Sequence, residues 1–162
     1  GSVVCACLEG NRPILVEVQA LVAKTPYGMP RRTAVGFDYN RVTMLLAILE
    51  RRLGMDFGAY DAYVNVVGGM RVTEPAADLA VAAALVSSYR NRPIPHGVLV
   101  MGEVGLTGEV RRIGSPERRI KDAMNLGFKR FVLPMGKLSL DEPCNGVVQV
   151  KTLEEALDKV FA

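Results

Sequence analysis

The stretch Thr73-Glu74-Pro75-Ala76-Ala77-Asp78-Leu79-Ala80 opens the most continuously apolar segment of the chain. Across residues 76–89 almost every side chain is Ala, Leu or Val, and the polar exceptions are Asp78, Ser87 and Ser88. A helix that is apolar nearly all round is buried on most sides, and its small side chains let neighbouring backbones come close. The segment therefore predicts a central helix that begins after Pro75 and is packed inside the domain.

Length and composition favour one ordinary globular domain. The chain has 162 residues, of which 49% are hydrophobic and 23% are charged, and this size supports a hydrophobic core without disulfides or metals. No apolar run approaches the roughly 20 residues of a membrane helix, and the chain has no basic-then-apolar secretory start. We expect a cytoplasmic protein with no membrane partner.

The remaining elements follow from local patterns. Two strands at 3–8 and 14–21 flank a turn, and residues 24–33, with three Pro or Gly residues, read as an exposed loop. Asn40 is expected to cap a helix that runs to about Leu53. Further strands are expected at 62–67, 98–101 and 131–134, a hairpin turn at 105–108, and a last helix at 153–161. Early hairpins followed by strand–helix alternation predict an α+β fold rather than a doubly wound sheet.

Ser115 and Pro116 predict the start of another helix, as N-cap and first-turn proline. Gly127 is expected to end it. On this helix the periodicity assigns the apolar side chains inward, and it assigns three cations mostly outward: Arg118, Arg119 and Lys121.

The basic residues are unevenly distributed. The net charge is only +3, but residues 90–130 hold nine Lys or Arg and four Asp or Glu, a local excess of five. Clustered Arg and Lys can follow a phosphate backbone. A solvated charged surface explains the same composition, so the distribution alone does not establish a nucleic-acid partner.

Three cysteines, Cys5, Cys7 and Cys144, give an odd number. Cys5 and Cys7 share a face of a predicted strand, but without further ligands they make a poor metal pair. We expect three reduced thiols and no metal site.

Three segments together resemble the active-site framework of Lon-type serine proteases. They are residues 73–80, 102–109 and the stretch Ile113-Gly114-Ser115-Pro116-Glu117. In that family the first holds a nucleophilic serine and the third a lysine base. Here Ala76 stands at the serine position and Glu117 at the lysine position, and neither side chain can replace the serine nucleophile or its base. The resemblance implies a pseudo-protease with no catalytic residues.

Longer segments are similar to the C-terminal domain of the bacterial RadA (Sms) family of DNA repair proteins. They are Val16-Glu17-Val18-Gln19-Ala20-Leu21-Val22, Pro30-Arg31-Arg32-Thr33-Ala34-Val35-Gly36, Asp38-Tyr39-Asn40-Arg41, Val64-Asn65-Val66 with Gly68-Gly69, and residues 73–78. The similarity covers nearly the whole chain and weakens after about Lys137. It implies one Lon-protease-like domain over 1–162, a fold that also occurs in a ribosomal protein and that forms rings.

The same resemblance implies a parent protein with a zinc finger and a RecA-like ATPase that moves branched DNA as a hexamer. This chain contains no Gly-x-x-x-x-Gly-Lys-Ser/Thr loop and no four-cysteine zinc motif. ATP, Mg²⁺ and Zn²⁺ are therefore expected only outside it. The expected partners are duplex or branched DNA, other copies of the chain in a homo-hexamer, and a RecA-type recombinase through the full-length protein.

Six arginines are the candidates for sequence-independent phosphate contacts: Arg31, Arg32, Arg111, Arg112, Arg118 and Arg119. Trp is absent and aromatic residues make up 6% of the chain, which disfavours a stacking platform for single strands. The alternative is a purely structural oligomerisation module whose basic patches pair with neighbouring subunits.

Three further groups of residues have more than one possible role. A surviving peptidase would need a Ser–Lys pair such as Ser115 and Lys121, but a helix cap and an exposed helix charge explain these two better. Asp78 is expected to be structural, accepting first-turn amide bonds or pairing with a nearby Arg. Five residues could supply apolar subunit contacts or belong to the core: Tyr27, Met29, Met55, Phe57 and Tyr60.

Overall fold

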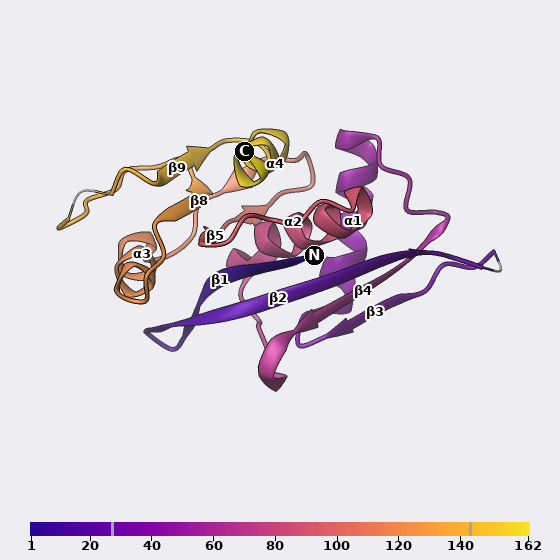
Figure 1. Ribbon diagram of the computed structural model, residues 1–162, viewed down its shortest axis with the longest axis horizontal. Coiled ribbons are helices and arrows are strands. Elements are labelled where there is room, and N and C mark those ends of the chain that lie inside the picture. Colours follow the sequence, from indigo (N-terminus) through magenta and orange to yellow (C-terminus); the bar gives the residue numbers. More distant parts are fainter. Residues whose placement is uncertain (27, 143) are drawn as a thin grey trace.

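The computed structural model describes residues 1–26, 28–142 and 144–162 (Figure 1). Its strands are β1 (Ser2–Glu9), β2 (Arg12–Lys24), β3 (Arg32–Val35), β4 (Tyr60–Val66), β5 (Val98–Val100), β6 (Glu103–Val104), β7 (Val110–Arg111), β8 (Arg130–Pro134) and β9 (Val147–Val150). Its helices are α1 (Tyr39–Leu53), α2 (Asp78–Arg90), α3 (Pro116–Asn125) and α4 (Leu153–Phe161), with short 3-10 turns η1 (Val67–Gly69) and η2 (Pro75–Ala77).

Seven strands form one mixed sheet in the order β3-β4-β2-β1-β5-β8-β9. The antiparallel pairs β1–β2 and β2–β4 lie in its first half, whereas β5, β8 and β9 run parallel to one another and to β1. β6 and β7 form a separate two-stranded hairpin. This single domain is consistent with the predicted α+β class, with early hairpins and later strand–helix alternation.

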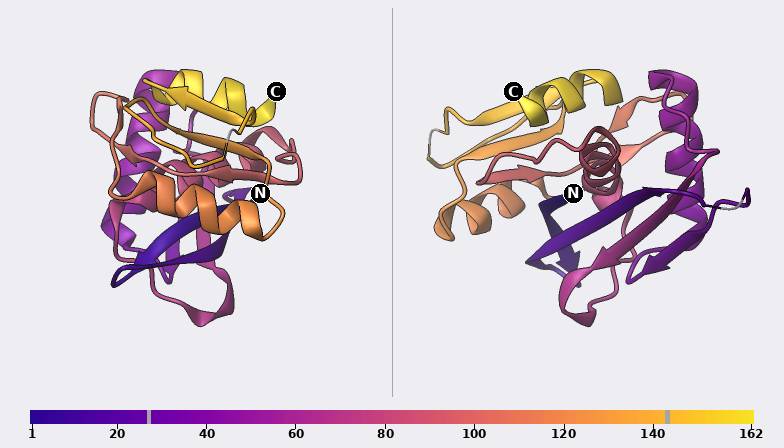
Figure 2. Two further views of the ribbon diagram at one scale, coloured as in Figure 1. Left: turned by 90° about the vertical axis from the view of Figure 1, so that its left-hand side faces the viewer. Right: turned by 45° about the vertical axis from the view of Figure 1, so that its right-hand side comes forward.

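The predicted central helix is confirmed. α2 lies against the sheet beside α1 and α4 (Figures 1 and 2). The side chains from Leu79 to Val86 are fully buried. Because they are mostly Ala and Val, the helix can be surrounded by neighbours at close range. α3 is on the other side of the fold, next to the β1–β2 hairpin.

Two helix starts differ from the sequence prediction. α1 is capped by Asp38, whose carboxylate accepts the backbone N–H of Asn40 at 2.8 Å, so Asn40 is already helical. Ser115 does precede α3, but its backbone is left-handed, with φ 53°, and its side chain makes no capping hydrogen bond. The position of this helix was therefore predicted correctly and the capping role of Ser115 was wrong.

Two strands were missed. β3 begins at Arg32, inside the segment 24–33 that was expected to be a loop, and continues past its end to Val35. β9 was not predicted. Both are four residues long and lie at the two edges of the sheet, where pairing with one neighbour, rather than strong local propensity, makes the strand. Among the described residues no helix has the length and apolar character to span a bilayer.

Candidate functional site

Ala76 and Glu117, at the predicted degenerate positions, have different surroundings. Ala76 lies on η2, is 4% exposed, and its carbonyl accepts the backbone N–H of Gly102 at 2.8 Å. A Cβ on Gly102 would come within 2.9 Å of the Val110 side chain, so this close approach requires glycine. Glu117 is in the first turn of α3 and is half-buried.

Asp78 is fully buried and has a structural partner. Its carboxylate accepts Nε of Arg41 at 2.8 Å and a second, shorter bond from Nη2, and it also accepts the backbone N–H of Val104 at 3.1 Å. Burial raises the pKa of Asp78, and these donors oppose that shift. The hydrogen bond to Asp78 raises the pKa of Arg41. The predicted pairing with a nearby arginine is confirmed, and it joins α1, α2 and β6.

The prediction that Arg119 points outward is wrong. Its side chain is 1% exposed, and Nη1 and Nη2 donate to the Glu74 carboxylate at 2.5 and 2.9 Å. Nη1 also donates to the Ala6 carbonyl and Nε to the Gly114 carbonyl. Helical periodicity identified the apolar face of α3, but it did not reveal that a carboxylate from another segment lay opposite this arginine.

Glu74 has a structural role that sequence patterns did not indicate. Besides holding Arg119, it accepts the backbone N–H of Leu8 at 2.6 Å. It therefore links β1, η2 and α3. No local signal marks this role, because its partners lie 45 and 66 residues away along the chain.

Arg31 and Arg32 are adjacent in sequence but differ in use. Arg31 is exposed, and its backbone N–H is held by the Asp61 carboxylate at 2.7 Å. Arg32 is half-buried, and its guanidinium donates to the carbonyls of Phe57, at 2.9 Å, and Tyr60. The Arg32 guanidinium is thus engaged inside the protein, whereas Arg31 is presented to solvent.

Arg118 is exposed, as predicted, and Arg111 and Arg112 are exposed as well. Arg111 is on β7 and faces Glu103 across the hairpin register. The Arg112 side chain lies beside Gly136. Arg118 donates to the carbonyl of Asn11 at 2.7 Å. Within the described ranges the only ion pairs under 4 Å are Arg41–Asp78 and Arg119–Glu74, so these three arginines are not in salt bridges.

The candidates for apolar subunit contacts divide into residues packed inside the domain and one exposed residue. Met55 and Phe57 belong to the core, and Tyr60 packs edge-on against Tyr89 with ring centroids 5.4 Å apart. Met29 is 84% exposed. Tyr27 lies outside the described residues.

The predicted thiol pair is buried. Cys5 and Cys7 have sulfurs 3.8 Å apart, and all three cysteines are free. The Cys7 thiol and burial raise the pKa of Cys5 well above its ordinary value. Among the residues the structure describes, no group of three His, Cys, Asp or Glu side chains is placed to hold a metal ion.

A family model described as subunit ChlI of Mg-chelatase matches residues 18–137. This chain belongs to that family. The match spans the sheet from the middle of β2 to the end of β8, together with α1, α2 and α3.

Curated relatives of this ChlI-family chain carry the name DNA repair protein RadA. The protein of Pseudomonas aeruginosa is 51% identical over 162 residues, covering 99% of this chain and 36% of the relative. That of Bacillus subtilis is 47% identical over 159 residues, covering 97% and 35%. That of Streptococcus pneumoniae is 44% identical over 165 residues, covering 100% and 39%. The chain thus spans a little over a third of the length of these relatives.

Proposed function

We propose that this chain is the non-proteolytic, Lon-protease-like domain of a RadA-type DNA repair ATPase. It serves as a hexamerisation platform and as a collar that contacts DNA without reading its sequence during branch migration. ATP, Mg²⁺ and Zn²⁺ act in the remainder of the parent protein. That parent works in the cytoplasm and meets a RecA-type recombinase.

The lack of proteolysis follows from the two degenerate positions. The methyl group of Ala76 cannot attack a peptide carbonyl, and the Glu117 carboxylate cannot act as a lysine base. The two carboxylates that flank Ala76 in sequence have structural uses, because Asp78 is held by Arg41 and Glu74 by Arg119. The framework that would orient a dyad here holds helices and strands together.

One observation carries the DNA role: exposed arginines that form no ion pair with any residue the structure describes, on a chain 44–51% identical to proteins named for DNA repair. Arg31, Arg111 and Arg112 are the proposed phosphate contacts, and Arg118, which is also exposed, is set apart because its guanidinium donates to the Asn11 carbonyl. A guanidinium can bind a phosphate with two parallel hydrogen bonds. Arg32 and Arg119 leave the set because their guanidinium groups are used inside the protein.

The test is a titration of the chain into fluorescein-labelled duplex DNA at several salt concentrations, followed by anisotropy. A logarithm of the association constant that falls linearly with the logarithm of salt concentration supports the collar, and the slope of that line counts the phosphates neutralised. A triple variant, Arg31→Ala with Arg111→Ala and Arg112→Ala, is compared with Lys129→Ala and Lys159→Ala, which remove exposed cations elsewhere. Absence of binding at low salt by a folded, assembled protein refutes the DNA role.

A second candidate function is an oligomerisation and protein-interaction module without DNA contact. The engagement of Arg32 and Arg119 within the chain favours it, because the basic clustering then has a partly structural origin. Sedimentation analysis with and without duplex DNA distinguishes this alternative from the DNA collar. Hexamers that do not bind duplex DNA fit only the oligomerisation module.

A further inference from the structure

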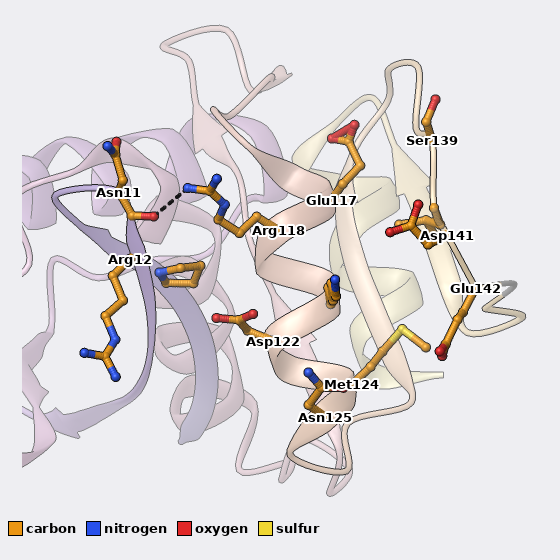
Figure 3. A pocket seen from close by; sticks show the side chains of 13 residues that line it. Asn11, Arg12, Glu117, Arg118, Asp122, Met124, Asn125, Ser139, Asp141 and Glu142 are labelled. Carbon is orange, nitrogen blue, oxygen red and sulfur yellow. Dashed lines mark hydrogen bonds between the residues drawn. The ribbon is translucent and has the colours of Figure 1, made fainter.

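A cleft of about 710 Å³ lies over α3, between the β1–β2 hairpin and the segment that follows β8 (Figure 3). Its lining comprises the hairpin residues Asn11, Arg12 and Pro13, the outer face of α3, and Ser139 to Glu142. Its volume is within the range of protein ligand sites. Glu117, one of the two degenerate positions, lies in this lining, but Ala76 and the proposed DNA contacts Arg31, Arg111 and Arg112 do not.

The charges in this cleft are divided between its two sides. Figure 3 shows Arg12 on the hairpin and Arg118 directed towards it. The opposite side carries Asp141 and Glu142, with Glu117 at the same end of the helix as Ser139. Asp122 is turned towards the hairpin, and Lys121 also lines the cleft. The hairpin side therefore carries both guanidinium groups together with Asp122. The other side carries Glu117, Asp141 and Glu142 together with the Ser139 hydroxyl, and Lys121 adds a third cation to the lining.

None of these charged side chains is in an ion pair within the described residues, although opposite charges lie around one hollow. The lining also includes three half-buried apolar side chains, Pro13, Met124 and Leu140. Met124 is directed from the helix towards Glu142 in Figure 3. An apolar surface between an acidic and a basic rim matches a ligand that carries both charges beside an aliphatic group.

We propose that this cleft binds an extended polypeptide segment of mixed charge from a partner protein. An acidic side chain of the segment pairs with Arg12 and Arg118, a basic one with Asp141 and Glu142, and an aliphatic one covers Met124 and Leu140. Opposite-charge pairs of this kind fix the register and reject wrong partners.

The same charges disfavour nucleic acid. Four carboxylates and three cations line the cleft, and a phosphate near Arg118 would also approach the carboxylates. Arg118 is thereby assigned to a protein partner instead of to the predicted DNA contact. Peptide binding in this cleft is independent of the DNA role, because Arg31, Arg111 and Arg112 do not line it.

The probe is a fluorescein-labelled nonapeptide of three Arg-Leu-Glu repeats, followed by anisotropy at 0.05–0.15 M salt. Comparison peptides replace Leu by Ser, Glu by Arg, or Arg by Glu. One protein variant reverses the acidic side with Asp141→Lys and Glu142→Lys, and another reverses the basic side with Arg12→Glu and Arg118→Glu. Asp158→Lys and Lys159→Glu, exposed on α4, are the matched controls.

We expect saturable binding of the mixed peptide and at least tenfold weaker binding of every comparison peptide. The acidic-side variant and the basic-side variant should each bind the mixed peptide at least tenfold more weakly than the unaltered chain. The affinities of the two α4 controls should stay within twofold of it. Duplex DNA affinity should not fall in the acidic-side variant, because these two substitutions only add positive charge. The proposal is overturned if the mixed peptide shows no saturable binding at millimolar concentration. It is also overturned if the cleft variants and the α4 variants change peptide affinity equally. A third contradicting result is that reversal of Arg12 and Arg118 weakens only duplex DNA binding and leaves peptide binding unchanged.

Discussion

Arg119 donates two hydrogen bonds to the carboxylate of Glu74, at 2.5 and 2.9 Å, and is itself 1% exposed. The pair joins α3 to the turn that precedes α2. With its further bonds to the carbonyls of Ala6 and Gly114, the arginine fixes α3 against β1. Arg119, itself one of the six arginines predicted to contact DNA, thus has a structural role inside the domain.

Replacing Arg119 by Ala should lower the free energy of unfolding by about 3 kcal/mol, because the Glu74 carboxylate, 22% exposed, is left without its partner. Arg118→Ala removes an equal charge from an exposed site and should change stability by no more than about 0.5 kcal/mol. Urea denaturation followed by circular dichroism measures both. Equal, small effects would show that the ion pair contributes nothing to stability.

Arg31→Ala should affect DNA binding and not stability, whereas Arg32→Ala should lower stability. Removing the exposed Arg31 should weaken binding to all duplex sequences alike and reduce the salt slope by about 0.9 for each phosphate that is no longer neutralised, with stability unchanged. Removing Arg32 breaks its bonds to the Phe57 and Tyr60 carbonyls and should cost about 1–2 kcal/mol of stability. Anisotropy and urea titrations separate the two outcomes. A salt slope unaltered by Arg31→Ala would remove this residue from the DNA contacts.

Asp61→Asn should reveal a pH-dependent contribution to stability. The backbone N–H of Arg31 and the hydroxyl of Thr25 hold the pKa of Asp61 below its ordinary value. A carboxyl with a depressed folded-state pKa stabilises the fold above its unfolded pKa of about 3.9 and loses that contribution as pH falls towards the folded value. The wild type should therefore exceed Asp61→Asn in stability at pH 6, and the gap should narrow below pH 4. Denaturation midpoints across this range test it, and a constant gap would contradict it.

Changing Ala76 to Ser and Glu117 to Lys together should not restore proteolysis. The new hydroxyl would be added to the Cβ of a residue that is 4% exposed, and Asp78 would remain paired with Arg41 beside it. Pro116, which also departs from the Lon-type sequence next to the lysine position, would remain unchanged. The measurement is release of fluorescence from labelled casein, with an active Lon-type protease in parallel. Turnover well above the unaltered chain would show that the framework still orients a dyad.

Native thiol labelling should distinguish the three cysteines. Cys5 has a raised pKa and is fully buried, and Cys7 is 6% exposed, whereas Cys144 is half-buried. Because the thiolate is the reacting species, one equivalent of Ellman's reagent should react quickly and two only after unfolding. Cys144→Ser should abolish the fast phase, and a fast phase that survives this substitution would contradict the assignment.

The sequence by itself determined the elements with strong local periodicity. The buried helix α2, the β1–β2 hairpin, α4 and the β6–β7 turn lie where the patterns indicated, because apolar spacing and turn residues act over a few positions. The assignment of Ala76 and Glu117 to degenerate positions also comes from the sequence alone, and it stays a prediction.

Only the tertiary structure decided the use of the charged residues. Arg118 and Arg119 are adjacent in one helix, yet one is exposed and the other is buried, because Glu74, 45 residues away, lies opposite only the second. The edge strands β3 and β9 likewise depend on neighbours in the sheet, and the cleft over α3 forms from three segments distant in sequence. Ion pairs, edge pairing and clefts are set by long-range contacts, and a local sequence pattern does not contain those contacts.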